Sequence, residues 1–347
     1  MRVPLRQHRG TTAHTCTLYP LSLQPSLGGY GAFVGKDVLA GGSGYFFDPF
    51  TAYERGWVTN PNVFLAGEPG CRKSTLVKTL LYRMHAVYGS TRYFAVLDPK
   101  NEYTQLAEAI GMKVVRLAPG GSSRINPLGD GGGPDEGRVL RQTASVTALL
   151  ETCAASTSGE RLSSTDRAAI SAAVKVTSTV AGATLGDLVR LWRAPTAELV
   201  SASQMAPERL AEAGQRVSDI AAALLGGVLA GMFDGASTER LSFDDPGVVV
   251  DLSAVQSDPA ALPLVMLATT AWLSELRVGA AKQWIQVMDE VWALLAHESS
   301  ARWLQASYKL GRTFGVANWL ITHRLSDMGA QADAGSAASE IGKGLLG

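Results

Sequence analysis

The chain has 347 residues, of which 46% are hydrophobic and 18% are charged, so it can bury a sizeable core and is not globally disordered. Lys and Arg together number 31, as do Asp and Glu, so no net charge draws the whole chain to nucleic acid or to an acidic membrane. The length allows one large α/β domain with an insertion, or two domains.

The cysteine content and the apolar runs indicate where the protein resides. Cys16, Cys71 and Cys153 are widely spaced, which fits a reducing cytosol better than a disulfide framework. The N-terminus lacks an apolar stretch of signal-peptide length, and the longest apolar run, near 260–273, is too short to span a bilayer. We therefore expect a cytoplasmic protein with no transmembrane segment of its own.

The first third of the chain predicts a parallel α/β sheet. Residues 1–60 are rich in Gly, Pro and aromatics, and the glycines before Tyr45-Phe46-Phe47 indicate a hairpin. Strands and helices then alternate, which is typical of a parallel sheet with its nucleotide site at the carboxyl ends of the strands. The expected elements are a strand at 62–66, a helix at 74–88, a strand at 93–97, a helix at 103–110 and a strand at 113–117.

The composition changes after Asn126-Pro127-Leu128. Residues 136–230 are mostly Ala, Leu, Ser, Thr and Arg, which predicts an all-helical insertion closed by a helix at 221–229. The α/β pattern then resumes with strands at 248–251, 284–288 and 316–322 and helices at 262–276 and 301–314. We predict four segments: a β-rich lead at 1–60, a first core part at 61–130, the insertion at 131–240 and a second core part at 241–347.

The most informative motif follows the strand at 62–66. A glycine-containing turn leads into Lys-Ser-Thr at the start of a helix, where backbone N–H groups and the helix N-terminus surround a phosphate. In such a loop the lysine reaches the outer phosphates of ATP and the next hydroxyl binds Mg²⁺. The residues predicted to bind the nucleotide are Gly67, Glu68, Pro69, Gly70, Cys71, Arg72, Lys73, Ser74 and Thr75.

Arg72 stands where this pattern usually has glycine. A side chain there threatens a clash with phosphate, or strains a backbone that needs a glycine conformation. A guanidinium also binds phosphate well and can swing aside. The sequence leaves open whether Arg72 weakens ATP binding.

A second nucleotide signature is Asp289-Glu290 at the end of the apolar strand 284–288. An aspartate at such a strand end helps to hold Mg²⁺ in phosphate-loop NTPases, and an adjacent glutamate can polarise the attacking water as a general base. A pair of solvated acids is the alternative. The phosphate loop upstream favours the functional interpretation, with Ser74 and Asp289 on the metal and Glu290 and Lys73 in catalysis.

Two further strand ends carry polar residues. His323 follows the strand 316–322 and is a candidate to contact the γ-phosphate or the attacking water, although an ordinary histidine in a loop is the alternative. Asp98 and Glu102 follow the strand 93–97 and are candidates for the same site. Turn formation by Asp98-Pro99 would also explain the first of them.

The order of these motifs resembles that of the conjugative-transfer ATPases of type IV secretion systems (TraC-like), within the HerA–FtsK superfamily. The resemblance covers about residues 30–347. It depends on the motifs at Gly67–Thr75, Asp98–Tyr103, Arg124–Leu128, Gly231–Gly235, Met288–Trp292 and Thr322–Asp327.

The resemblance implies a RecA-like phosphate-loop core that binds ATP and Mg²⁺. It also implies a homo-oligomer, usually a hexamer, that moves DNA or protein through a secretion channel, with attachment to the inner face of the membrane through partners. His323 stands where relatives commonly carry a glutamine sensor. The chain also ends soon after the sensor strand, so we expect it to be truncated at its C-terminus.

Three functions remain open at this point. The first is an ATP-driven motor subunit for conjugative transfer, with secretion-channel or conjugation proteins as partners. The second is a degenerate nucleotide-binding relative that acts as a non-catalytic assembly subunit, favoured by Arg72, His323 and the short C-terminus. The third is a DNA translocase of the HerA/FtsK type.

Overall fold

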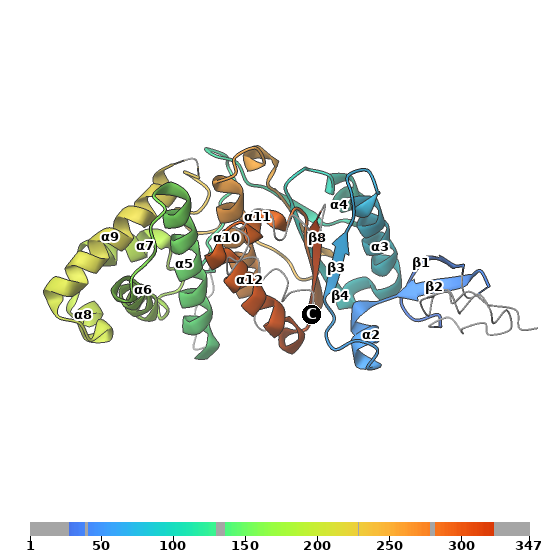
Figure 1. Cartoon of the computed structure of the whole chain (residues 1–347), viewed down its shortest axis with the longest axis horizontal. Coiled ribbons are helices and arrows are strands. Elements are labelled where there is room, and N and C mark those ends of the chain that lie inside the picture. Colours follow the sequence, from blue (N-terminus) through green and yellow to red (C-terminus); the bar gives the residue numbers. More distant parts are fainter. Residues whose placement is uncertain (1–27, 39–40, 130–135, 228, 278–281, 323–347) are drawn as a thin grey trace, which may run out of the picture.

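The computed structural model describes residues 28–38, 41–129, 136–227, 229–277 and 282–322. Figure 1 shows an elongated molecule with a sheet in its middle, a group of helices at one end and a two-stranded hairpin at the other. Among the described residues, no helix combines the length and apolar character needed to cross a bilayer.

The hairpin consists of β1 (Ala32–Asp37) and β2 (Ser43–Phe47), which pair antiparallel and confirm the predicted hairpin. The next element, α2 (Pro49–Glu54), is a helix within a segment for which we expected only strands and turns. Its start is specified locally, because the Asp48 side chain accepts a hydrogen bond from the Thr51 N–H at 2.8 Å and proline occupies the first turn.

In the part of the chain that the structure describes, six parallel strands form the central sheet, in the order β3-β8-β7-β4-β6-β5. The predicted α/β class and mainly parallel sheet are therefore confirmed, with each strand within one or two residues of its expected place. The strands are β3 (Val63–Ala66), β4 (Arg92–Asp98), β5 (Lys113–Arg116), β6 (Gly247–Asp251), β7 (Gln283–Met288) and β8 (Val316–Thr322).

Helices cover both faces of the sheet, so β4, β6 and β8 are buried along their whole length, and β7 is buried after its first residue. Along β4, Phe94 and Val96 face the hydrophobic cluster formed with α3 (Lys73–Tyr88) and α4 (Thr104–Ile110). The alternate residues face the larger cluster, which includes α10 (Ala261–Leu276). This alternation follows from the two-residue period of a strand.

Among the described residues between β5 and β6 there are five α-helices, as the composition of that stretch predicts. Capping boxes begin two of them, Ser163 with Asp166 and Thr184 with Asp187. The helix expected at 221–229 is the end of a longer helix that begins at Pro207. The five helices are α5 (Glu136–Thr157), α6 (Ser164–Thr177), α7 (Leu185–Arg193), α8 (Ala197–Ser203) and α9 (Pro207–Gly226).

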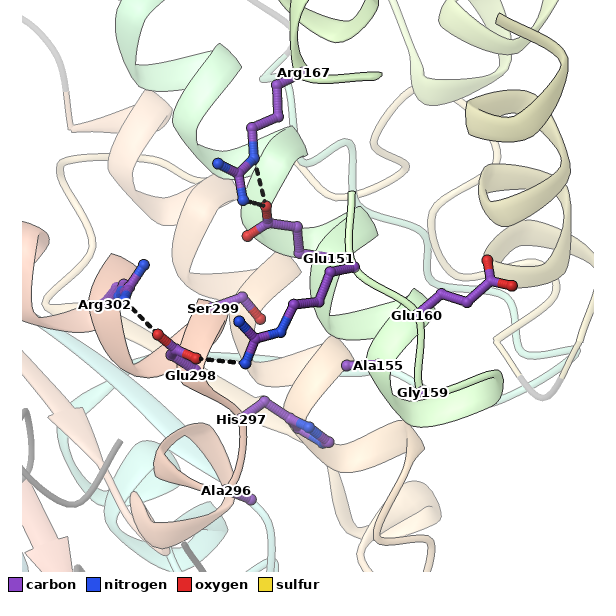
Figure 2. A pocket seen from close by; sticks show the side chains of 11 residues that line it. Glu151, Ala155, Gly159, Glu160, Arg167, Ala296, His297, Glu298, Ser299 and Arg302 are labelled. Carbon is purple, nitrogen blue, oxygen red and sulfur yellow. Dashed lines mark hydrogen bonds and ion pairs between the residues drawn. The ribbon is translucent and has the colours of Figure 1, made fainter. Parts of the chain in front are cut away.

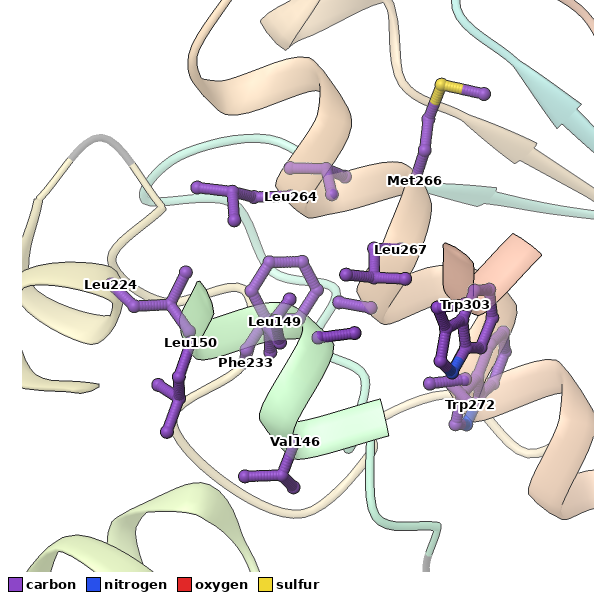
Figure 3. Close-up of a cluster of buried hydrophobic side chains, with 14 of the residues drawn as sticks. Val146, Leu149, Leu150, Leu224, Phe233, Leu264, Met266, Leu267, Trp272 and Trp303 are labelled. Carbon is purple, nitrogen blue, oxygen red and sulfur yellow. The ribbon is translucent and has the colours of Figure 1, made fainter. Parts of the chain in front are cut away.

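The insertion helices share one core with the sheet. In Figure 3, Leu149 and Leu150 of α5 and Leu224 of α9 lie near Leu264 and Leu267 of α10. Helix α12 (Glu298–Leu310), preceded by the short α11 (Trp292–Leu295), also packs against α5. A single cluster thus ties the insertion to the core, and the boundaries at 131 and 240 stay a prediction.

Candidate nucleotide site at the carboxyl edge of the sheet

The strand order brings the sequence motifs to one edge of the sheet. Since all six strands are parallel, the loop after β3, Asp98 at the end of β4, Asp289 after β7 and Thr322 at the end of β8 lie at the same edge. Strand β8 lies between β3 and β7, so Thr322 stands between the loop and the acid pair. Ligands of open α/β sheets bind at this edge.

The loop between β3 and α3 is largely exposed, and two of its carbonyl oxygens contact the side chain of Lys73. Lys73 Nζ donates hydrogen bonds to the carbonyl oxygens of Gly67 at 2.6 Å and Glu68 at 3.1 Å. A Cβ on Gly67 would lie 3.5 Å from Cδ of Lys73, and Gly70 has φ +85°. The loop therefore places an ammonium group beside the N-terminus of α3, where an anion is stabilised.

Arg72 occupies the N-cap position of α3 with φ 60° and ψ 33°. This left-handed conformation favours glycine and costs another residue about 1–2 kcal/mol, so the strain that the sequence suggests is present. Residues other than glycine can still adopt this conformation. The Arg72 carbonyl oxygen accepts the first hydrogen bond of the helix, from Leu76 N at 3.0 Å. The Arg72 side chain is exposed.

The acid pair lies against the start of α3. Asp289 and Glu290 are both buried, with 6% and 4% of their surface exposed. Asp289 Oδ2 is 3.4 Å from Ser74 Oγ and accepts a hydrogen bond from Tyr103 OH at 3.2 Å, and its Oδ1 accepts one from Glu290 N at 2.9 Å. The two residues predicted to hold the metal are thus neighbours, although 215 positions separate them in the chain.

Glu290 follows with φ 56°, a second left-handed residue at this edge. Its Oε1 forms an ion pair with Lys100 Nζ, and its Oε2 accepts a hydrogen bond from the Trp292 indole N–H. Neither Lys100 nor Trp292 was predicted as a site residue. Both lie within motifs that the sequence singles out, but only the pairing of β4 with β7 places Lys100 near Glu290.

Burial sets the direction of the pKa shifts of Asp289 and Tyr103, and the charge of Glu290 sets that of Lys100. Burial and the neighbouring Glu290 charge raise the pKa of Asp289, against hydrogen bonds that lower it. Burial and the charge of Asp289 raise the pKa of Tyr103 strongly, so its phenol remains a hydrogen-bond donor. Burial would lower the pKa of Lys100, but the hydrogen bond and charge of Glu290 outweigh it and the net shift is upward.

The donor set fits a magnesium ion bound together with a nucleotide. Within the described residues no group of three or more His, Cys, Asp or Glu side chains is placed to hold a metal ion. Mg²⁺ commonly takes one or two protein oxygens and completes its shell with water and substrate phosphates. The Ser74 hydroxyl and the Asp289 carboxylate supply such oxygens beside the loop.

The carboxylate of Asp98 stabilises the turn that follows β4. Its Oδ1 accepts hydrogen bonds from the N–H groups of Lys100 at 3.3 Å and Glu102 at 2.9 Å, and its Oδ2 accepts one from that of Tyr103 at 2.8 Å. These bonds fix the turn between β4 and α4. The carboxylate of Asp98 therefore positions Lys100 and Tyr103.

The third predicted element is described only in part. Thr322 is buried, and its Oγ1 has no hydrogen-bond partner among the residues that the structure describes. A buried hydroxyl at this edge suits a ligand contact. His323 lies outside the described residues, so its predicted contact with the γ-phosphate stays a prediction.

A separate cavity of about 310 Å³ lies where α5 and the following loop meet the start of α12 (Figure 2). Five of the charged side chains that line it form ion pairs: Arg167 with Glu151, and Arg161 and Arg302 with Glu298. None of the loop residues or acids described above lines this cavity. It is a junction between the insertion and the core, and we assign no ligand to it.

The parallel sheet with this loop and acid pair defines a RecA-like phosphate-loop NTPase fold. No protein-family model matches the sequence, and no curated protein matches it. Solved structures do match. VirB4 of Thermoanaerobacter pseudethanolicus has 19% identity and a TM-score of 0.66, over 92% of this chain and 83% of that one.

The plasmid coupling protein TrwB also matches. Its complex with the GTP analogue GDPNP has 13% identity and a TM-score of 0.55, over 86% of this chain and 70% of that one. Its complex with ADP and Mg²⁺ has 13% identity and a TM-score of 0.54, over 82% and 68%. The resemblance to conjugation and type IV secretion ATPases is thus confirmed at the level of the fold.

Proposed function

We propose that this chain is an ATP-binding and ATP-hydrolysing motor subunit of a conjugative DNA-transfer or type IV secretion system. The observation that carries the proposal is the meeting of the phosphate loop with the buried acid pair, where Ser74 Oγ lies 3.4 Å from Asp289 Oδ2. The fold shared with VirB4 and TrwB supports the transfer role.

Each residue of the edge has a role in this proposal. The loop Gly67–Thr75 binds the phosphates, with Lys73 on the outer ones, and Ser74 and Asp289 hold Mg²⁺. Bound Mg²⁺ would neutralise charge that develops on the phosphates. Glu290 takes a proton from the attacking water, and His323 contacts the γ-phosphate.

The assembly belongs to the same proposal. We infer a cytoplasmic homo-oligomer, a hexamer by resemblance, that is attached to the membrane through channel or conjugation proteins and acts on DNA or protein. The coupling-protein likeness leaves a DNA translocase as a variant of this function. Stimulation of hydrolysis by DNA would favour that variant.

Hydrolysis of MgATP by the purified chain tests the proposal. Glu290→Gln keeps the size of the side chain but removes the base, so the rate should fall by about 10²–10⁴-fold. Glu275→Gln is the matched control, because Glu275 is also largely buried and is paired with Arg141 at 3.1 Å. Equal rates in the wild type and Glu290→Gln would refute the assigned role.

A non-catalytic assembly subunit is the second candidate, and Arg72 is the observation that favours it. Arg72→Ala removes the side chain but keeps the backbone strain, whereas Arg72→Gly removes both. If the Arg72 side chain obstructs phosphate binding, both variants should bind ATP more tightly than the wild type. If the strained backbone weakens phosphate binding, only Arg72→Gly should bind ATP more tightly. Failure of all three proteins to bind ATP would support the assembly subunit.

A further inference from the structure

The carboxylate of Glu290 is held between two donors. Lys100 Nζ pairs with Oε1, and the indole N–H of Trp292 binds Oε2. The Glu290 side chain is 5% exposed, whereas that of Lys100 is 32% exposed. Solvent and ligands can therefore reach the lysine more easily than they reach the acid.

Local structure fixes this pair. Asp98 Oδ1 accepts a hydrogen bond from the backbone N–H of Lys100, and the next residue, Asn101, has φ 54°. On the neighbouring strand, Asp289 N donates to the carbonyl oxygen of Leu97 at 3.4 Å. The chain segments that carry Lys100 and Glu290 are thus tied to each other and directed to the same edge.

A bound nucleotide would compete for the lysine. If Ser74 and Asp289 hold Mg²⁺, the metal would bring the outer phosphates of ATP to the edge of the sheet that also carries Glu290 and Lys100. An ammonium group binds phosphate as a point charge, and a terminal phosphate carries more negative charge than one carboxylate. The partly exposed Lys100 side chain is long enough and flexible enough to change partners.

We propose that Lys100 is a positioning residue that senses the terminal phosphate. In the nucleotide-free chain it clamps Glu290 against Trp292, and on ATP binding it transfers to the terminal phosphate and releases Oε1 toward the attacking water. This inference rests on the proposed function, since it needs ATP at the loop. ADP has no terminal phosphate at that place and leaves the clamp closed.

The Trp292 indole reports on the clamp without any need for hydrolysis. In protein labelled with 5-fluorotryptophan, the ¹⁹F resonance of Trp292 can be assigned among the seven tryptophans by Trp292→Phe. Lys100→Met should move this resonance in the nucleotide-free protein, and Lys100→Arg should restore it. In the wild type, Mg²⁺ with ATPγS should move it, and Mg²⁺ with ADP should not.

Affinity gives a second measurement. Lys100→Met should weaken binding of ATPγS about tenfold, since one charge-assisted contact is lost, and leave ADP binding within about twofold. Lys113→Met is the matched control, because Lys113 is also 32% exposed and paired with a glutamate, Glu239, at 2.8 Å. That control should change neither affinity.

Several results would overturn the inference. An unmoved Trp292 resonance in nucleotide-free Lys100→Met rules out the clamp, and equal weakening of ADP and ATPγS rules out the sensing of the terminal phosphate. Absence of nucleotide binding in every variant refutes the proposed function and the transfer of Lys100 with it. In that case the nucleotide-free spectrum still decides whether the clamp exists.

Discussion

The carboxyl edge of the sheet and the helical insertion are built in opposite ways. Of the four residues other than glycine with positive φ in the described chain, Arg72, Asn101 and Glu290 lie at the edge. The edge also buries carboxylates that belong to no helix cap. In the described insertion helices, the buried carboxylate of Asp166 completes a capping box, and apolar side chains fill the core shared with the sheet. Strain and buried charge gather where a ligand would bind, and regular packing supplies the stability.

The largest loss of stability is expected in the insertion, from Trp192→Ala. Trp192 of α7 is 1% exposed, and its indole N–H donates to the Ala169 carbonyl oxygen at 3.2 Å. Its removal should lower the free energy of unfolding by about 3–5 kcal/mol, because it leaves a cavity and removes a buried hydrogen bond. Chemical denaturation measures this. Trp57→Ala, at a site 43% exposed, should cost far less, and similar losses would contradict the packing described here.

At the edge, the same type of measurement should give the opposite sign. Burial and Glu290 raise the pKa of Asp289, so the folded chain disfavours its ionised form. The wild type without nucleotide therefore loses stability as the pH rises from the ordinary value of 3.8 through the raised pKa. Asp289→Asn avoids this loss and should raise the free energy of unfolding by about 1 kcal/mol at pH 8, with a smaller gain toward pH 5.

Asp251→Asn is the matched control for that prediction. Burial would raise the pKa of Asp251, but hydrogen bonds from Ser253 and the charge of Arg116, 2.8 Å away, lower it overall. Its carboxylate therefore contributes stability above the ordinary pKa, and that contribution is lost as the pH falls through the lowered value. Asp251→Asn should destabilise the chain at pH 8. A loss of stability in Asp289→Asn as well would remove the contrast between the two acids.

An effect of similar size is expected at a helix cap in the insertion. Ser163 Oγ accepts a hydrogen bond from Asp166 N at 3.2 Å, and Asp166 Oδ2 accepts one from Ser163 N at 2.8 Å. Ser163→Ala should lower the free energy of unfolding by about 1 kcal/mol. Ser178→Ala, at the other end of α6, should lower it by less, and no difference between the two would show that the cap adds nothing measurable.

Local sequence patterns predict much of this fold. The strand positions, the hairpin and the helical insertion follow from apolar periodicity and glycine placement, and the loop and acid pair follow from their motifs. Helix α2 was missed because an Asp48-Pro49 start also reads as a turn. The early start of α9 was missed because its N-terminal turns are polar.

The ion pair of Glu290 with Lys100 could not be predicted from the sequence for a different reason. Strand order is a non-local property, and without the β4–β7 pairing Lys100 is only a lysine in a turn. The same holds for Tyr103, whose contact with Asp289 spans 186 positions. Backbone strain at Arg72, by contrast, could be predicted from the sequence alone, because Arg72 replaces the glycine of the motif and the structure gives it a left-handed conformation.

The most direct test of the account is Mg²⁺-dependent ATP binding, measured by titration calorimetry on the wild type, Lys73→Ala and Lys78→Ala. Lys78 of the same helix α3 donates to the Glu102 carbonyl oxygen at 3.2 Å and serves as the control. We expect ATP to bind to the wild type and to Lys78→Ala, more tightly with Mg²⁺, and binding to be lost in Lys73→Ala. Equal binding with and without Lys73 would contradict a phosphate site at the carboxyl edge.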